Sequence, residues 1–327
     1  MSSFPADLVP PTVALAKAVP AIPESNGLPG GAVYEPKWDG FRLTIIKDGD
    51  VHLWSRQKRE LTDAFPDLAR AAHDQLPDGV IVDGEAIVWS EGRLDFGALQ
   101  QRLVLRHERR EREVSARPAA YAAFDVLAVD YRDARELGFA DRRSLLEELA
   151  GGWQEPLTLS PATRDEDEAA EWFATLPEQG IEGLVVKGAA QPYRGNRRDW
   201  VKVKHRDTVD VIVGAVNGTI AHPRELIIGL PDDDGALRIV GHSTALSSAA
   251  AGELKGVIAK PAGSHPWPKT REANRWRHES SELTLVEPFV IEISADTARD
   301  DGVFRHPVRF VRLRPEMTPA DLGRRRA

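Results

Sequence analysis

The segment Lys37-Trp38-Asp39-Gly40-Phe41-Arg42 decides how this chain is interpreted. It joins one strand-like run, AVYEP, to another, FRLTII, which begins at Phe41. A turn between these strands would bring an amine, a carboxylate and a guanidinium together. Taken alone, the segment also fits a surface turn that carries a Lys–Asp pair.

Three further charged elements follow along the chain. Asp83-Gly84-Glu85 interrupts the apolar run VIVDGEAIVW, and Glu182 and Lys187 bracket the run GLVV. In Trp200-Val201-Lys202-Val203-Lys204, alternation places the two lysines on one face of a strand. Because like charges repel, an anion such as phosphate would stabilise that face. Each element alone also fits ordinary strand ends, or an edge strand protected by lysine.

The composition limits the class of protein. A length of 327 residues suggests two domains, and 42 % hydrophobic with 29 % charged residues is typical of a globular chain. Cysteine is absent, which excludes disulfides and cysteine-ligated metals. No apolar run approaches the ~18 residues of a membrane span, so we expect no membrane association, and the absence of cysteine fits a reducing cytoplasm.

Turn signals and periodicity predict the organisation. Asp48-Gly49 between two apolar runs indicates a hairpin, and the run around Asp83-Gly84 is interpreted as a pair of buried strands. Residues 1–30 are rich in Pro, Ala and Gly and predict an extended arm, while 105–118 form a charged connector. The net charge of −8 falls on the chain before Arg206. The later residues are neutral in total and predict a small β-barrel after a helix-containing first domain.

The elements, in this order, resemble the covalent nucleotidyltransferase superfamily of DNA ligases, RNA ligases and mRNA capping enzymes. Phe124-Asp125 and Tyr193-Arg194-Gly195 match further motifs, and the resemblance spans about residues 33–315. It implies an α+β fold, with an adenylation domain of antiparallel sheets and helices over 1–204 and an OB-fold β-barrel over 205–327.

The resemblance also implies roles for individual residues. Lys37 would be the nucleophile that carries AMP, and Lys202 and Lys204 would hold the α-phosphate. Free lysine has a pKa near 10.4, and we expect Lys202, Lys204 and a divalent metal to lower that of Lys37. The remaining ATP-binding residues would be Glu35, Arg42, Glu85, Phe124, Glu182 and Lys187. Glu182 and Glu85 would hold Mg²⁺ or Mn²⁺, with Asp39 the less favoured metal ligand.

The missing cysteines and the short stretch before Gly31 exclude the NAD-dependent ligases, which carry an extra N-terminal domain and a four-cysteine zinc module. ATP is therefore the expected AMP donor. The chain resembles the short two-domain C-class bacterial ligases of actinobacteria. This resemblance implies sealing of 5′-phosphate/3′-hydroxyl nicks in duplex DNA during repair, by a monomer, with a repair polymerase or an end-joining factor as a partner by family analogy.

Arginines supply the predicted DNA and pyrophosphate contacts. The DNA-binding candidates are Arg56, Arg102, Arg271, Arg275 and Arg277. Arg305 and Arg309 resemble the family's last motif, which closes over the pyrophosphate. Two alternatives remain open: an RNA ligase or guanylyltransferase of the same superfamily, and a catalytically inactive nucleic-acid-binding scaffold.

Overall fold

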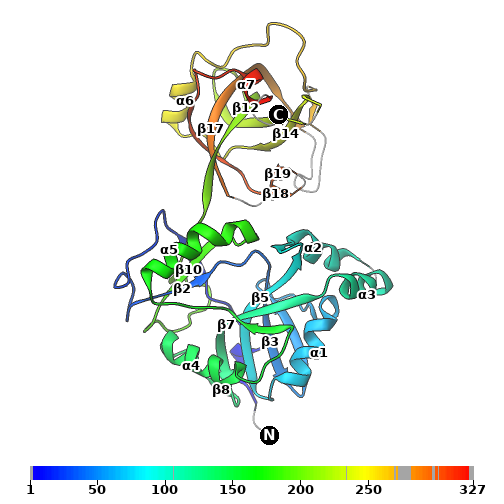
Figure 1. Ribbon diagram of the computed structural model, residues 1–327, viewed down its shortest axis with the longest axis vertical. Coiled ribbons are helices and arrows are strands. Elements are labelled where there is room, and N and C mark those ends of the chain that lie inside the picture. Colours follow the sequence, from blue (N-terminus) through cyan, green and yellow to red (C-terminus); the bar gives the residue numbers. More distant parts are fainter. Residues whose placement is uncertain are drawn as a thin grey trace. The chain divides into compact units, whose positions relative to one another are not determined.

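The computed structural model describes residues 3–105, 107–232, 234–268, 270–271, 281–296, 299–300 and 302–323. The chain divides into two compact units, Met1–His205 and Arg206–Ala327 (Figure 1). This boundary lies one residue from the boundary predicted from the sequence. Within the described ranges, no helix is long and apolar enough to cross a membrane.

The first unit contains a small sheet of four strands in the order β1-β11-β10-β2. Its strands are β1 (Ala16–Ala18), β2 (Ala32–Pro36), β10 (Gly183–Gly188) and β11 (Trp200–Lys204). The predicted alternation in β11 is confirmed, because Val201 and Val203 are buried while Lys202 and Lys204 are half-buried. The strand therefore presents two cations on one face and anchors itself through the other.

The larger sheet of this unit has the order β4-β3-β5-β7-β8, with β6 beside β5 and β9 beside β7. The predicted hairpin is confirmed, since Asp48 pairs with Asp50 across Gly49. Its strands are β3 (Phe41–Asp48), β4 (Asp50–Ser55), β5 (Val80–Ser90), β6 (Arg93–Leu94), β7 (Ala119–Val129), β8 (Arg132–Asp133) and β9 (Leu157–Leu159).

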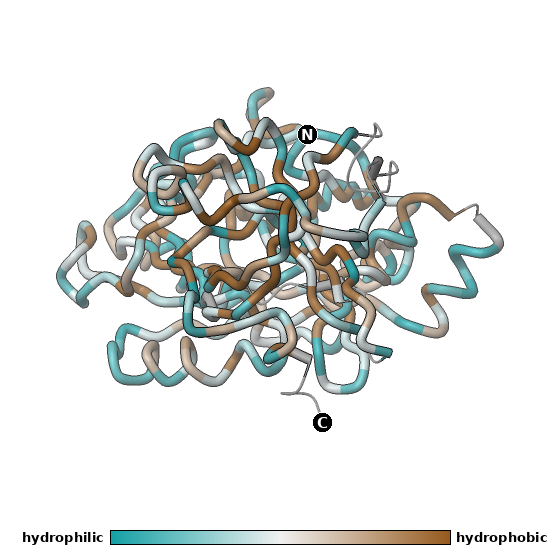
Figure 2. The backbone as a smooth tube through the Cα atoms, turned by 90° about the horizontal axis from the view of Figure 1, so that it is seen from above, coloured by the Kyte–Doolittle hydropathy of each residue, from teal (hydrophilic) through white to brown (hydrophobic). Residues whose placement is uncertain are grey.

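Helices cover the outer faces of the two sheets. Leu68 of α1, Leu99 of α2 and Leu146 of α4 pack on the larger sheet, and Ala169 of α5 packs on the smaller one. Figure 2 shows apolar segments concentrated in the interior of the chain trace. The helical segments are η1 (Ala6–Leu8), η2 (Thr62–Ala64), α1 (Pro66–Gln75), α2 (Phe96–Val104), α3 (His107–Ala116), α4 (Phe139–Ala150), α5 (Glu166–Thr175) and η3 (Leu176–Gln179).

Three sequence expectations are corrected here. The run around Asp83-Gly84 is one continuous strand, β5, with a register shift against β7 at these two residues. The glycine is needed here for close packing and does not end the strand, because a Cβ at Gly84 would lie 2.5 Å from the Tyr121 ring. The charged connector contains the helix α3, whose polar surface stands out in Figure 2.

The third correction concerns the N-terminal arm, which was predicted within the first domain as an extended segment without a strand of its own. β1 pairs in parallel with β11, with Ala16 opposite Trp200. Leu8, Val13 and Ala14 are buried in a core that includes Tyr193 and Trp200. Proline and alanine content predicted extension correctly but gave no indication of this long-range pairing.

The second unit is built on a five-stranded sheet in the order β14-β13-β12-β17-β20. Its long strands β12 and β17 pair antiparallel from Arg206–Asp296 to Val216–Thr284 and carry a bulge at Val213/Ala215. A separate core of aliphatic side chains fills this unit. Its elements are β12 (Arg206–Gly218), β13 (Pro223–Pro231), β14 (Leu237–His242), α6 (Ser248–Leu254), β15 (Thr270–Arg271), β16 (Ser281–Glu282), β17 (Thr284–Asp296), β18 (Arg299–Asp300), β19 (Val303–Phe304), β20 (Arg309–Leu313) and α7 (Pro319–Gly323).

Candidate functional site

The backbone around Lys37 is held in place by the strands beside it. Its N–H donates to the carbonyl of Gly183 (2.8 Å), and its own carbonyl accepts from the N–H of Glu182 (2.9 Å). Gly183 has φ +140°, and a Cβ there would lie 2.1 Å from the carbonyl oxygen of Val203. The glycine in Glu182-Gly183 is therefore required by the close approach of β10 and β11 beside Lys37.

The side chain of Lys37 forms an ion pair with Glu182, whose other oxygen accepts from Lys204 Nζ at 3.0 Å. Burial raises the pKa of Glu182, but the two lysines outweigh it and bring the pKa down to about 2. Burial likewise lowers the pKa of Lys37, but Glu182 outweighs it and the net pKa is raised. The predicted lowering is therefore wrong for the chain without nucleotide, because a carboxylate, rather than a second cation, lies nearest the amine.

The neighbouring lysine, Lys202, has the lowered pKa that the sequence analysis predicted for Lys37. The pKa of Lys202 is lowered, first by burial and then by the positive charges of Lys37 and Lys204. This cation lines the pocket, and no ion pair to it is found in the part of the chain that the structure describes. An anionic ligand in the pocket would therefore be stabilised by Lys202.

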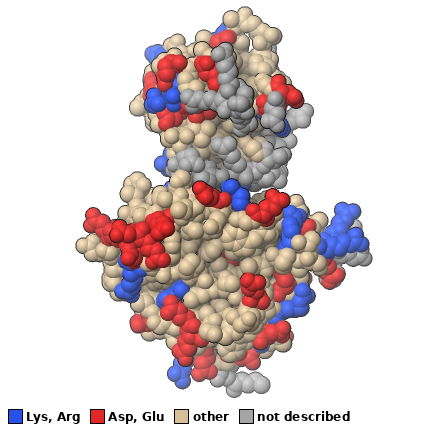
Figure 3. Space-filling view, viewed as in Figure 1, with Lys and Arg blue, Asp and Glu red and all other residues tan. Residues whose placement is uncertain are grey.

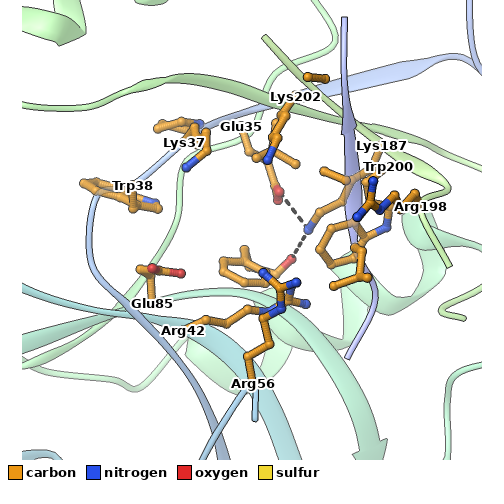
Figure 4. Close-up of a pocket in the computed structure, with 16 residues that line it drawn as sticks. Glu35, Lys37, Trp38, Arg42, Arg56, Glu85, Lys187, Arg198, Trp200 and Lys202 are labelled. Atoms are coloured by element: carbon orange, nitrogen blue, oxygen red, sulfur yellow. Dashed lines mark hydrogen bonds and ion pairs between the residues drawn. The ribbon is translucent and has the colours of Figure 1, made fainter. Parts of the chain in front are cut away.

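A pocket of ≈ 380 Å³ opens beside Lys37, between the two sheets of the first unit. Figure 4 shows side chains from β2, β3, β5, β10 and β11 converging on it. A volume of this size is within the range of small-ligand sites. Of the residues predicted from the sequence, its lining includes Glu35, Lys37, Arg42, Arg56, Glu85, Phe124, Lys187 and Lys202.

Part of the pocket lining was missed by the sequence analysis. Leu15, Ala16 and Ala18 of the arm line the pocket, and so do Trp38 and Arg198, which lie on opposite sides of it in Figure 4. Trp38 was visible within the lysine motif, but its packing could not be inferred from position alone. The arm lines the pocket because of the β1–β11 pairing, for which the local sequence holds no signal.

Arg42 is fixed at the base of the pocket by a buried carboxylate. Its guanidinium donates two hydrogen bonds to Asp83, at 3.0 and 2.6 Å, and a third to the carbonyl of Ala14 at 2.6 Å. The hydroxyl of Tyr193 donates to the same carboxylate at 2.6 Å. Asp83 therefore orients Arg42, whereas Glu85, two residues along β5, faces the pocket.

Glu85 lies in a different electrostatic environment from Glu182. Burial raises its pKa to about 8, and the attraction of Lys37 and Arg42 offsets this only in part. Asp83 and Asp39 add like charge that raises the pKa further. Near neutral pH this carboxyl group is largely protonated until another cation comes close to it.

Lys187 and Glu35 form the inner end of the pocket. Lys187 is fully buried, and its ammonium lies 2.7 Å from Glu35 Oε2 and donates to the Phe124 carbonyl at 2.8 Å. It also lies 4.7 Å from the centre of the Phe124 ring and 4.4 Å from that of Trp200. The aromatic rings and the carboxylate thus share one buried cation, which fixes their relative positions.

The arginines predicted to bind DNA have different surroundings. Arg56 is exposed and lines the pocket. Arg102 is fully buried, with its guanidinium bonded to Asp67 at 2.9 Å and to the Arg117 carbonyl. Its assignment to DNA is wrong, because Arg102 faces the protein interior from α2 and was mistaken for a surface residue. Arg275, Arg277 and the side chain of Arg271 lie outside the described residues.

The surface also shows where charge gathers. Figure 3 shows Lys and Arg side chains at the projecting helix α3 and acidic side chains over α5. Within α3, Arg110 donates to the backbone carbonyls of Arg102, Asp63 and Leu105 and is thereby tied down. Fewer arginines of α3 are therefore available to a ligand than the number of arginines in its sequence suggests.

In the second unit, Arg309 is exposed on β20 and Arg305 is half-buried. The two following arginines are already paired, Arg312 with Glu292 at 2.6 Å and Arg314 with Glu316 at 2.6 Å. No ion pair to Arg309 is found among the described residues. An incoming anion would therefore meet less competition at Arg309 than at Arg312 or Arg314.

Comparison with known proteins gives consistent results. A family model described as the ATP dependent DNA ligase domain matches residues 13–204. The chain is 34 % identical over 315 residues to DNA ligase C2 of Mycolicibacterium smegmatis, covering 89 % of this chain and 88 % of that protein. It is also 34 % identical over 331 residues to DNA ligase C of Mycobacterium tuberculosis, covering 93 % and 90 %.

Solved structures show the same likeness. The ligase domain of LigD from M. tuberculosis aligns with a TM-score of 0.51 and 28 % identity, covering 98 % of this chain and 99 % of that one. A Lig E DNA ligase aligns with a TM-score of 0.55 and 14 % identity, covering 92 % and 100 %, and shows a shared fold.

Proposed function

Because the chain belongs to the ATP-dependent DNA ligase family, we propose that it seals nicks through an AMP carried on Lys37. The observation that carries this assignment to Lys37 is the position of its amine, at the pocket wall and in an ion pair with Glu182. This position supports Lys37 as the nucleophile, because its amine lies beside a pocket of ≈ 380 Å³ that Lys202 also lines.

Lys37 would act in three steps. Its neutral amine attacks the α-phosphorus of ATP, so that an N–P bond forms and the bond to pyrophosphate breaks. The AMP then passes to the 5′-phosphate of the nick and frees the lysine. The 3′-hydroxyl finally attacks that phosphate, and AMP leaves as the phosphodiester forms. Since the ion pair keeps Lys37 protonated, Glu182 must be drawn away from it before the first step.

Three features of the pocket fit ATP. Glu35 Oε1 is buried there and has no hydrogen-bond partner among the described residues. A carboxylate oxygen accepts from the 6-amino group of adenine and repels the 6-oxo group of guanine. The Phe124 ring would stack on the base, while Arg42 and Glu85 would hold the ribose. Of these features, the Glu35 carboxylate favours ATP over GTP, and hence a ligase over a guanylyltransferase.

The pocket also fits Mg²⁺ or Mn²⁺ bound partly through substrate. Among the described residues no group of three or more His, Asp or Glu side chains could hold a metal alone. Mg²⁺ commonly uses one or two carboxylates together with substrate phosphates, and Glu85 with Glu182 supplies them, with Asp39 the less favoured alternative. When bound, the ion would neutralise charge on the phosphates.

The two units would divide the work. The first unit is the adenylation domain, and we assign the second, with its five-stranded sheet, to the OB-fold. Arg305 and Arg309 would close over the pyrophosphate, and the lack of an ion pair to Arg309 among the described residues supports its part. Arg56, Arg271, Arg275 and Arg277 would contact the nicked duplex.

The cellular setting follows the relatives. M. tuberculosis LigD, a multifunctional non-homologous end joining DNA repair protein, is 30 % identical, and this chain spans 37 % of its length. This similarity supports a repair ligase with an end-joining factor or a repair polymerase as a partner. We propose in addition that the chain acts as a monomer in the cytoplasm, at the nucleoid.

Covalent labelling tests the function. The purified chain would be incubated with α-³²P-ATP or α-³²P-GTP and then chased with singly nicked duplex DNA. We expect label from ATP alone, discharged by nicked DNA with strand sealing. Label from GTP, or label that only nicked RNA discharges, would contradict the proposal. No label, with mass spectrometry excluding prior adenylation, would leave the inactive scaffold.

Glu85→Gln should stabilise the free protein at alkaline pH. The pKa of Glu85 is raised to about 8 in the folded state, so the folded chain retains a proton that the unfolded chain releases above about pH 4.5. Stability therefore falls as pH rises from about 4.5 to 8 and levels off above it. Glutamine mimics the protonated form and removes this loss, worth about 1.4 kcal/mol per pKa unit.

Urea unfolding at several pH values measures this effect. We expect Glu85→Gln to exceed the wild type by at least about 2 kcal/mol at pH 8 and to equal it at pH 4.5. Glu91→Gln, at an exposed site in the turn after β5, is the matched control and should show no such trend. A difference that is independent of pH would contradict the prediction.

A further inference from the structure

We infer that Arg143 is a positioning residue for base selection, holding the Glu35 carboxylate ready for a purine with an amino group at position 6. The inference rests on the proposed function, since it concerns how that function selects its nucleotide. Arg143 lies on α4 and is not among the residues that line the pocket. It would therefore act through Glu35 and not by touching the base.

The geometry around Glu35 distinguishes its two oxygens. Oε2 is occupied by Lys187 Nζ at 2.7 Å, whereas Oε1 has no hydrogen bond in the described residues. The cation facing Oε1 is Arg143, with Nη1 at 3.6 Å. This separation is too long for a hydrogen bond but short enough for strong attraction. Oε1 is thus a buried acceptor that faces the Arg143 charge and makes no hydrogen bond among the described residues.

Arg143 cannot easily move closer to Glu35, because its other contacts hold it. Its Nη1 donates to the Ser160 carbonyl at 2.8 Å, and its Nε donates to Glu147 at 2.7 Å. The Ser160 hydroxyl in turn accepts from Trp38 Nε1 at 2.9 Å. The guanidinium is therefore fixed between the surface of α4 and the pocket wall, at a constant distance from Oε1.

A second cation is needed at this position because Lys187 is shared. Its ammonium also donates to the Phe124 carbonyl and lies 3.7 Å from Asp125. Burial opposes charge on Glu35, which is 2 % exposed. Without Arg143, Lys187 would be the one cation left at ion-pair distance from Glu35 among the described residues, and Asp125 draws on it as well as on Arg142. Burial raises the pKa of Glu35, and Lys187 and Arg143 oppose that rise. Loss of Arg143 would therefore favour the protonated form, which is a weaker acceptor for a 6-amino group.

The test compares ATP with purine riboside 5′-triphosphate, which lacks only the 6-amino group. Bound AMP is first discharged with pyrophosphate, and sealing of a fluorescent nicked duplex then gives kcat/KM for each nucleotide. We expect the wild type to prefer ATP by about 10- to 100-fold, the value of a hydrogen bond to a charged group. In Arg143→Gln the preference should fall to within about threefold.

Three further variants separate positioning from structural damage. Glu147→Gln removes a surface partner of Arg143, leaves its charge in place, and should keep the wild-type preference. Glu35→Ala removes the acceptor and should lose the preference, and the double variant Glu35→Ala/Arg143→Gln should lose no more than Glu35→Ala alone. Arg143→Met replaces the glutamine variant if that variant does not fold.

The outcomes distinguish the two claims. If Arg143→Gln slows both nucleotides equally and keeps their ratio, the inference is overturned. A wild type that seals equally well with both nucleotides overturns it too, while the ligase function stands. A wild type that seals with neither nucleotide instead removes the proposed function.

Discussion

Lys37→Ala is expected to abolish covalent attachment of AMP, lowering the label from α-³²P-ATP by at least about 10³-fold, to the background. The substitution removes the atom that forms the N–P bond, and covalent catalysis of this kind has no substitute within reach. Lys202, the next pocket cation, is held on a different strand, so its amine approaches from another direction. Gel autoradiography after a fixed incubation measures the effect.

The matched control for this variant is Lys17→Ala. Lys17 is exposed on β1 between two residues that line the pocket, without lining it itself. Its removal should leave labelling unchanged. Lys37→Ala should also still seal a nick that already carries AMP on its 5′-phosphate, because the last step does not use the lysine amine. Persistent label in Lys37→Ala would place the nucleophile elsewhere.

Asp125→Ala is expected to reduce the free energy of unfolding by about 3–5 kcal/mol. Asp125 is fully buried and accepts from Arg142 at 2.7 and 3.0 Å, and Lys187 lies 3.7 Å away. Arg142 and Lys187 are themselves fully buried. Removing the carboxylate leaves two desolvated cations facing one another, with Glu35 as the nearest remaining counter-charge. Urea unfolding at pH 7 measures the change.

Asp74→Ala provides the comparison, since the side chain of Asp74 is 75 % exposed beside His73. An exposed aspartate of this kind should change stability by no more than about 0.5 kcal/mol. Asp125→Asn keeps the shape and removes the charge, so it should lie between the two. Equal stability for Asp125→Ala and Asp74→Ala would show that the buried cluster contributes little.

The sequence predicted those parts of the fold and site that depend on local patterns. The hairpin followed from Asp48-Gly49, and the two-faced strand followed from the alternation of lysine and valine over Trp200–Lys204. Lys37 and Glu85 could be placed in one pocket because their motifs recur in order in a known superfamily. Such features can be predicted from neighbouring residues alone, or from the arrangement of the same motifs in the superfamily.

The features that were missed depend on residues far apart in the sequence. The burial of Arg102 depends on Asp67, 35 positions away, and the Lys37–Glu182 pair spans 145 positions. This second pairing reverses the direction of the predicted pKa shift. Periodicity also could not show that Arg143, one residue after a fully buried arginine, would reach Glu35. The distance between two charges far apart in the sequence is set by the folded structure, and local sequence patterns do not reveal it.

The pairing of β1 with β11 has a consequence for the order of events during synthesis. One wall of the pocket comes from residues near position 16, and its hydrogen-bonded partner begins at Trp200. When the arm leaves the ribosome, the strand that will hold it has not been made. At about 5–20 residues per second, the synthesis of the arm precedes that of the strand at Trp200 by roughly ten seconds or more. The pocket beside Lys37 is therefore completed late in translation, and a nascent chain that stalls before Trp200 carries Lys37 without a complete pocket.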